Sequence, residues 1–279
     1  MTIQRLRSVE ARPPEAPAAV TGYPVVLKGI GKTFLTQSGQ LVKAIDNIDL
    51  EIEAGGFVVI VGPSGCGKST LLNCIAGLEK TETGTVTVNG HQVGGRVTDD
   101  VGYMFQQDTL FPWYTVEKNI ALGLRYAGKL NHAESRGRVD HLLEMADLSS
   151  VRKSYPSELS GGMRRRVALC AALAIQPRVL LMDEPFGALD TFTKASIQQY
   201  LLKFWDSLRP TVIFVTHDLE EAVTLADRVV VLSRRPAYIK EIIEVGIDRP
   251  RDVYAVKDTP EFLTDYRRTW RALGGEFDH

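Results

Sequence analysis

The sequence predicts an α/β fold built on a mostly parallel sheet with helices on both faces. In the second half of the chain, short apolar segments typical of buried strands alternate with helical segments. A glycine-rich loop stands between one such strand and a helix. The 279 residues are enough for one large domain or two modest ones, with a substantial core.

The composition argues against several classes of protein. The formal net charge is -1, so no overall basic field favours a nucleic-acid partner. Cys66, Cys74 and Cys170 are too few and too scattered for a disulfide framework or a zinc site, and they suit a reducing cytosol. The N-terminus has no apolar signal core, and no run approaches the roughly 18 apolar residues that would span a membrane. We therefore expect a soluble, cytoplasmic chain whose membrane role would need a separate partner.

The first part of the chain is predicted to hold a tail and a small antiparallel sheet. Residues 1–22 include an Ala- and Pro-rich run and are expected to form a flexible tail. From Val25 to Ile60, alternation and glycine breaks predict antiparallel strands that lead into a buried strand. A further strand over 84–88 is expected to end in an Asn-Gly turn.

The remainder is predicted to be a helical insertion, an α/β region and a short extension. Residues 112–176 are mainly helical in pattern, and the main domain is expected to span 23–235. Strands are expected over 178–184, 211–218 and 228–233, with helices over 193–208 and 219–226 between them. The extension over 236–279 contains a possible strand and a helix around 260–273, on which Phe262 and Trp270 are expected to pack against the main domain.

The loop after the strand at 57–61 has the pattern of a phosphate-binding loop in its required setting, between a strand and a helix. Glycines let backbone N–H groups turn inward around phosphate, Lys68 supplies a positive charge to the β and γ phosphates, and Ser69 offers its hydroxyl to magnesium. The alternative, a glycine-rich turn with a surface lysine, is disfavoured by this setting. The predicted nucleotide-binding residues of the loop are Gly62, Pro63, Ser64, Gly65, Cys66, Gly67, Lys68, Ser69 and Thr70. Because Cys66 lies near Lys68 and a helix start, we expect a favoured thiolate whose alkylation inhibits the protein.

Two acids follow the apolar strand at 179–182. A strand buried on both faces can hold acids only at its end. Asp183 is expected to bind magnesium through water, and Glu184 to act as the general base that polarises the water attacking the γ-phosphate. The alternative is that both acids cap and begin the next helix, which Pro185 and Gly187 interrupt.

Two more polar residues end apolar strands. His217 follows the strand at 211–216 and could hydrogen-bond the γ-phosphate and hold the attacking water, although a lone histidine is more often structural. Gln106 ends the strand at 101–105, and its amide can touch both magnesium and water because it donates and accepts. Because ligands bind at the carboxyl ends of parallel strands, these groups would converge on one sheet edge. They predict hydrolysis of ATP, with Mg2+, by positioning and electrostatics.

A second glycine-rich turn precedes the helix that starts near residue 161. Ser160, Gly161 and Gly162 lead into an apolar stretch, where free N–H groups could hold a second anion. The alternative is a plain helix cap by Ser160 above a core stripe. Both can hold, but capping alone leaves the double glycine unexplained.

Together these motifs resemble those of the ATP-binding cassette (ABC) ATPases over roughly residues 24–235. "GPSGCGKST" resembles their Walker A loop, "VLLMDE" their Walker B strand and "LSGGM" their signature motif. "FQQ" is similar to the glutamine loop at Gln106, "GALD" to the D-loop ending at Asp190, and "THD" to the switch histidine at His217. Phe34 falls where the family places an aromatic residue that stacks on adenine. One position departs: Arg164, Arg165 and Arg166 run together where the commoner form has a glutamine between two arginines, and we expect no change in the chemistry.

The resemblance implies a P-loop NTPase ABC cassette with a mixed RecA-like core sheet, an N-terminal antiparallel β subdomain and a helical signature subdomain. In this family two cassettes, identical or related, pack head to tail. Each ATP then lies between the Walker A loop of one subunit and the signature loop of the other. Ser160 and the N–H groups of Gly161 and Gly162 would close over the partner's γ-phosphate, with Asp190 nearby.

The segments over 110–124 and 183–205 resemble the nitrate, sulfonate and taurine importers. This implies ATP-driven uptake of a small anion at the cytoplasmic face of the membrane, with separate permease subunits, indirectly a substrate-binding protein, and no nucleic acid. Phe111, Pro112 and Trp113 would contact the permease, unless they are core residues of the helical part. The solute itself cannot be read from this chain. A cassette acting on nucleic acid or ribosomes, and a small-molecule kinase, are the alternatives; the sequence has no long coiled coil or second cassette, and a kinase would not need "LSGGM".

Overall fold

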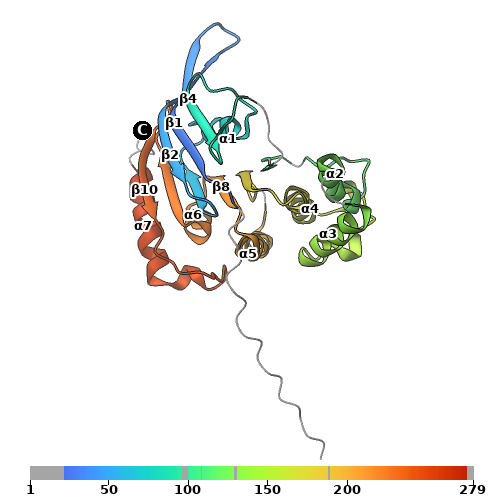
Figure 1. Ribbon diagram of the computed structural model, residues 1–279. Coiled ribbons are helices and arrows are strands. Elements are labelled where there is room, and N and C mark those ends of the chain that lie inside the picture. The colour runs from blue at the N-terminus through green and yellow to red at the C-terminus, as the bar shows by residue number, and fades with distance from the viewer. Residues whose placement is uncertain (1–21, 96–99, 108, 129–130, 188, 275–279) are drawn as a thin grey trace, which may run out of the picture.

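The computed structural model describes residues 22–95, 100–107, 109–128, 131–187 and 189–274. The predicted tail, apart from Gly22, and Ala188 of the D-loop therefore lie outside the described residues. The rest forms two lobes, one with both sheets and one with helices α2, α3 and α4 (Figure 1). Among the described residues, no helix combines the length and apolarity that crossing a bilayer requires.

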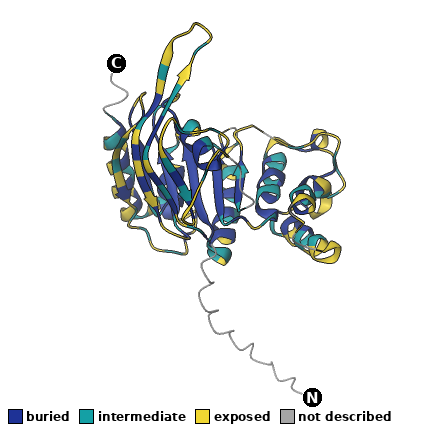
Figure 2. Cartoon of the chain, turned by 45° about the horizontal axis from the view of Figure 1, so that its top comes forward, coloured by how far each residue is buried: buried dark blue, intermediate teal, exposed yellow. Residues whose placement is uncertain are grey.

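The larger sheet is mixed, which confirms the predicted fold class. Five of its strands run parallel, and β10 pairs antiparallel with β9 at one edge. The central strands are buried on both faces (Figure 2), as their unbroken apolar sequences require. In spatial order the strands are β10 (Ile239–Glu244), β9 (Arg228–Leu232), β3 (Phe57–Val61), β8 (Thr211–Thr216), β7 (Val179–Asp183) and β6 (Val101–Met104).

The smaller sheet is antiparallel and lies over one face of the larger one together with helix α1 (Lys68–Ala76). Asn89 (φ 50°) and Gly90 (φ 76°) form the predicted Asn-Gly turn, because both residues take the left-handed conformation that tight hairpins need. Its strands, in spatial order, are β2 (Leu41–Ile52), β1 (Val25–Leu35), β4 (Thr83–Val88) and β5 (His91–Gln92).

The opposite face of the larger sheet is covered by helices α5 (Thr191–Leu208) and α6 (Leu219–Leu225). Alternate residues of each central strand point to opposite faces, so Phe57 packs toward α5 and Val58 toward the smaller sheet. Helix α5 begins two residues earlier than predicted, because Asp190 accepts a hydrogen bond from the Thr193 backbone N–H and caps it there.

The helical lobe consists of α2 (Val116–Ala127), α3 (His132–Met145) and α4 (Gly161–Ala174), with 3₁₀ turns at Ser149–Val151 and Pro156–Glu158. Helix α4 has its apolar side in the lobe's core, and its first turn faces the sheet lobe. This helix therefore connects the two lobes.

The C-terminal part adds β10, a 3₁₀ turn at Val256–Asp258 and helix α7 (Pro260–Gly274). Phe262 is buried, in agreement with its predicted packing against the main domain, whereas 57% of the surface of Trp270 is exposed, which contradicts the same prediction for Trp270. The helical period explains the difference, since the buried positions of α7 are Phe262, Asp265, Thr269 and Leu273 and Trp270 lies beside that row.

Candidate active site

The phosphate loop folds into a backbone cradle between β3 and α1. Gly65 (φ 72°) and Gly67 (φ 126°) adopt conformations that other residues avoid, and a Cβ on Gly67 would lie 3.0 Å from the Ala44 carbonyl oxygen. Gly67 is the N-cap of α1 and provides no side chain to bond the first-turn N–H groups. The start of α1 is thus suited to an anion, with inward N–H groups and the positive end of the helix dipole.

Lys68 and Cys66 are both buried in this loop. The Lys68 ammonium donates hydrogen bonds to the carbonyl oxygens of Gly62 at 2.9 Å and Pro63 at 3.0 Å. Burial raises the pKa of the Cys66 thiol, and the nearby positive charge of Lys68 only partly opposes that rise. The predicted thiolate is therefore wrong, because removal from water outweighs the attraction of the charge.

Ser69 and Asp183 join the phosphate loop to the end of β7. The Ser69 hydroxyl donates to Asp183 Oδ1 at 3.0 Å. Burial raises the pKa of Asp183, while the Ser69 hydrogen bond acts in the opposite direction. A hydroxyl and a carboxylate side by side are oxygen donors of the kind that Mg2+ prefers, so these residues fit a magnesium ion.

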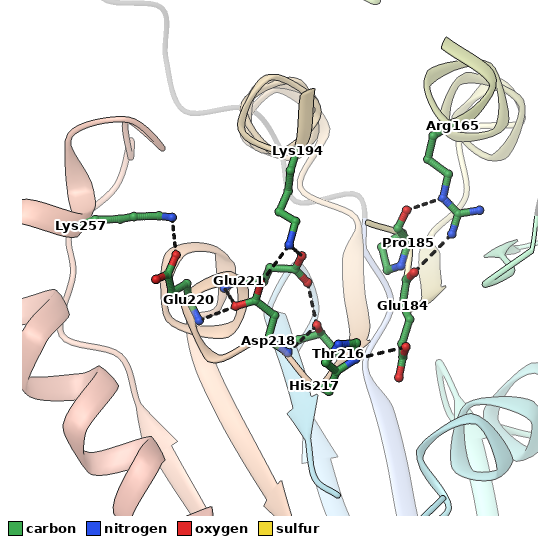
Figure 3. A network of polar contacts seen from close by, with 10 residues as sticks. All are labelled: Arg165, Glu184, Pro185, Lys194, Thr216, His217, Asp218, Glu220, Glu221 and Lys257. Atoms are coloured by element: carbon green, nitrogen blue, oxygen red, sulfur yellow. Dashed lines mark hydrogen bonds and ion pairs between the residues drawn. The ribbon is translucent and has the colours of Figure 1, made fainter. Parts of the chain in front are cut away.

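Glu184 lies at the junction of three strand ends. Its Oε2 accepts a hydrogen bond from Gln106 Nε2 at 3.1 Å. The same oxygen lies 3.2 Å from His217 Nδ1 (Figure 3). The structure thus brings together the predicted base and both predicted water-positioning residues. The Glu184 backbone has φ 42°, a conformation that typically costs a non-glycine residue on the order of 1–3 kcal/mol.

A cavity of about 490 Å³ lies between the lobes beside these groups. Gly161 of the signature turn lines the same cavity as Glu184 and His217. Among the described residues of its wall there is none from the phosphate loop. The full lining is Gln106, Gly161, Arg164, Arg165, Glu184, Gly187, Leu189 and His217.

The signature turn is exposed, and its two glycines have different structural reasons. Ser160 caps α4 by accepting a 3.3 Å hydrogen bond from the Met163 N–H. A Cβ on Gly162 would lie 2.5 Å from Thr193 Cγ2 of α5, so packing requires glycine there. The nearest atom to a Cβ on Gly161 is Arg164 Nη2 at 3.8 Å, which is ordinary contact. Packing therefore explains why residue 162 is glycine but does not explain why residue 161 is glycine.

Comparison with known proteins decides the family. A family model described as "ABC transporter" matches residues 45–187. The chain is 44% identical to the nitrate import ATP-binding protein NrtD of Synechococcus elongatus, over 84% of this chain and 85% of that one. It is 42% identical to an aliphatic sulfonates import ATP-binding protein, SsuB, of Bacillus thuringiensis, over 82% of this chain and 88% of that one.

The chain belongs to the ABC transporter family. Its fold matches the dimeric structure of MJ0796, a bacterial ABC transporter cassette, with a TM-score of 0.72 and 34% identity over 80% of this chain and 100% of that one. It also matches a dimeric post-hydrolysis state of that cassette bound to ADP and Pi, with a TM-score of 0.71 and 33% identity. The predicted family, fold and ATPase activity are confirmed, and this chain is an ABC ATPase that binds ATP.

The residues on either side of His217 in this ABC ATPase are held by a group of ion pairs and hydrogen bonds that involves α5 and α6 (Figure 3). Lys194 binds Asp218 at 2.9 Å and Glu221 at 3.0 Å, and Thr216 donates to Glu221 at 2.6 Å. Burial opposes the charge on Lys194, but the hydrogen bond to Asp218 and the Glu221 charge outweigh it and raise the Lys194 pKa. Asp218 also caps α6, so the residues on either side of His217 are fixed.

The two remaining predicted residues lie at the surface. Asp190 is exposed, and the hydrogen bond from Thr193 lowers its pKa. Phe34 lies near the end of β1 with 36% of its surface exposed, and Lys32 Nζ lies 4.9 Å from the centre of its ring.

Sequence reasoning missed one residue of the site altogether. Arg165 is buried, and its guanidinium binds the carbonyl oxygens of Pro185 and of Glu184, the latter at 3.3 Å. The only signal in the sequence was an arginine, in place of the family's commoner glutamine, in the middle of the run after the signature, and nothing in its spacing indicates which backbone it reaches.

Proposed function

We propose that this chain is the ATP-hydrolysing subunit of a membrane importer for a small anion of the nitrate, sulfonate or taurine kind. The names of its relatives support this class of solute, since they are nitrate and aliphatic sulfonate import proteins. The chain would work at the cytoplasmic face of the membrane with separate permease subunits and, indirectly, a substrate-binding protein.

The geometry around Glu184 carries the proposed chemistry. Its carboxylate accepts from Gln106 and lies beside His217, so a water held among these three side chains can give its proton to Glu184 as its oxygen attacks the γ-phosphorus. The bond from the γ-phosphorus to the bridging oxygen then breaks, and ADP and phosphate leave. Lys68 and the backbone N–H groups of the phosphate loop hold the triphosphate.

Ser69, Asp183 and Gln106 would hold Mg2+. The hydrogen bond between Ser69 and Asp183 supports this assignment because it sets two suitable oxygens side by side. When bound, Mg2+ supplies charge neutralisation at the β and γ oxygens.

We assign the signature turn to the nucleotide of a second copy or a related cassette. Ser160 and Gly161 are exposed at the start of α4, and both solved structures compared above are dimeric. Ser160 and the N–H groups of Gly161 and Gly162 would close over the partner's γ-phosphate, with Asp190 at the seam. Phe34 would stack on the adenine of its own subunit's ATP.

The permease would dock on the aromatic loop after Gln106. Phe111 and Trp113 are exposed, so they are surface rather than core residues, and their rings lie 5.5 Å apart. Asn119 is buried beneath the loop, where its side chain accepts from the Phe111 N–H at 2.8 Å and donates to the Tyr114 carbonyl at 3.0 Å. An exposed aromatic cluster on a fixed backbone is typical of a protein interface.

Glu184→Gln tests the proposed chemistry. We expect kcat to fall by at least about 100-fold, because glutamine cannot accept the proton, while ATP binding is retained and a long-lived ATP-bound dimer forms. Phosphate release, ATP titration and size-exclusion chromatography measure these outcomes. Turnover near that of the unmodified protein would remove Glu184 from the role of base.

The solute is tested with the assembled transporter. Its ATPase activity should rise when the substrate-binding protein is loaded with the correct anion, assayed against nitrate, taurine, alkanesulfonates and bicarbonate. Co-purification with ribosomes or DNA instead of permease subunits would contradict the proposed role in import.

A further inference from the structure

Arg165 makes an unusual contact between the signature helix and the base of the same chain. It is the fifth residue of α4, with 6% of its surface exposed. Its Nε donates to the Pro185 carbonyl and its Nη2 to the Glu184 carbonyl (Figure 3). A guanidinium that donates to two successive carbonyl groups fixes both the position and the direction of that backbone, because its donors form a rigid fork.

Arg165 binds the backbone at Glu184, where the conformation is unfavourable for a residue other than glycine. Glu184 has φ 42°, which a non-glycine residue keeps only where its surroundings determine it. Its N–H donates to the Val215 carbonyl at 2.9 Å, which fixes the side toward β8. Arg165 fixes the carbonyl side, so the Glu184 side chain projects from a backbone that is held on both sides.

We propose that Arg165 is a positioning residue that aims the Glu184 carboxylate at Gln106 and His217. The inference rests on the proposed role of Glu184 as the base. It also has a consequence for the dimer, because Arg165 lies on the helix whose first turn would serve the partner's ATP. Movement of α4 on that ATP would then be transmitted through Arg165 to the base of its own subunit.

Under this proposal the arginine at position 165 would affect the chemistry, contrary to the expectation from the sequence. A glutamine, the commoner residue of the family here, is shorter than arginine and has a single amide nitrogen. Its two N–H donors diverge from that one nitrogen, so they do not reproduce the spaced Nε and Nη2 donors with which Arg165 reaches the two carbonyl groups. In this chain, therefore, Arg165 supplies a two-point hold that a glutamine cannot reproduce.

Arg165→Met, Arg165→Gln and Arg165→Lys test the proposal in the full-length protein. We expect Arg165→Met to lower kcat for ATP by about 10- to 100-fold with KM changed by less than about twofold, because a misplaced base slows the chemical step without touching the bound nucleotide. Arg165→Gln and Arg165→Lys can each keep one hydrogen bond, so their kcat should lie between those of Arg165→Met and the unmodified protein. Equal kcat values for Arg165→Met and the unmodified protein would overturn the proposal.

Arg166→Met is the matched control. Arg166 lies next on the same helix, and its Nη1 donates to the Ala146 carbonyl at 2.9 Å, within the helical lobe. Its removal should lower the unfolding temperature by about as much as Arg165→Met does, but leave kcat within about twofold. A similar loss of kcat in both variants would overturn the proposal, because it would show that general damage to α4 is enough.

A double variant distinguishes an effect of Arg165 on Glu184 from an effect on the start of α4. With Glu184→Gln already present, adding Arg165→Met should still allow the ATP-dependent dimer to form, since Arg165 is placed to act on the base. Loss of that dimer would show that Arg165 acts through the signature turn and would overturn the inference. Retained turnover in Glu184→Gln alone would contradict the proposed role of Glu184 as the base. Loss of turnover in Glu184→Gln together with full activity in Arg165→Met would contradict only the role of Arg165.

Discussion

Helix α1 begins after a glycine-rich turn and helix α4 begins with two glycines, yet the two helix starts differ in how they are capped and exposed. At α1 the cap is Gly67, which has no side chain to occupy the first-turn N–H groups, and Lys68 is buried against its own loop. At α4 the exposed Ser160 caps its own helix. This geometry supports the proposal that the turn before α1 binds phosphate within its own chain, whereas the exposed turn at the start of α4 supplies half of a site shared with a second chain.

The glycines at the two helix starts also differ in whether the fold of the chain itself requires them. Gly65 and Gly67 are required by positive φ angles, and Gly162 by its closeness to Thr193. Gly161 has neither reason and lines the cavity beside Glu184. A small residue that the fold does not require, at the open end of a helix, is most simply explained by a ligand from outside the chain.

The largest expected effects come from breaking each turn separately. Lys68→Ala and Ser160→Arg should each lower ATP turnover by about 100-fold or more, because both remove groups that contact the triphosphate in the proposed assembly. Only Lys68→Ala should abolish ATP binding, since we assign Ser160 to the nucleotide of another subunit. Titration with a fluorescent ATP analogue distinguishes the two, and loss of binding in monomeric Ser160→Arg would contradict the assignment to a partner.

Substitutions at Gly161 and Gly162 should differ in their effect on the free energy of unfolding. Gly162→Ala should lower the free energy of unfolding by about 1–3 kcal/mol, because the new Cβ overlaps Thr193 Cγ2. Gly161→Ala should change it by less than about 0.5 kcal/mol, because the space is open. Urea denaturation measures both values. Thr193→Ser should restore much of the loss in Gly162→Ala, and failure to do so would contradict the packing explanation.

The smallest expected effect is that of alkylation at Cys66. Because burial raises its pKa above the ordinary value of 9.0, the thiol is protonated at neutral pH, and iodoacetamide at pH 7 should change ATPase activity by less than about twofold. The rate of modification should rise by about tenfold per pH unit from pH 7 toward the raised pKa, as the thiolate fraction increases. Rapid inactivation at pH 7 that ATP prevents would contradict this correction.

Local patterns in the sequence were sufficient to predict the strands and their polar ends. The phosphate loop, Asp183 and Glu184 stand directly after apolar strands, and parallel strands place such ends together. The meeting of Gln106, Glu184 and His217 follows from that rule, although their order across the sheet does not follow from their order in the chain.

Other features depend on contacts between distant residues and were not predictable. The hold of Arg165 on Glu184 depends on how α4 meets the β7 end, and the need for glycine at 162 depends on where Thr193 lies. The thiolate prediction for Cys66 failed because charge can be read from the sequence but depth of burial cannot. The prediction for Trp270 failed because the face that α7 buries depends on how the helix docks, and Trp270 lies beside the buried row.

The central claim, that each ATP is held by one chain and sealed by another, is tested most directly by mixing two inactive variants. One carries Lys68→Ala and Glu184→Gln, the other Ser160→Arg and Glu184→Gln, so that neither can form an ATP-bound dimer alone. Mixed in equal amounts with Mg2+ and ATP, they share one intact composite site, formed by the phosphate loop of the second chain and the signature turn of the first. Native mass spectrometry should then detect a heterodimer with one ATP per two chains. A mixture that stays monomeric would contradict the account.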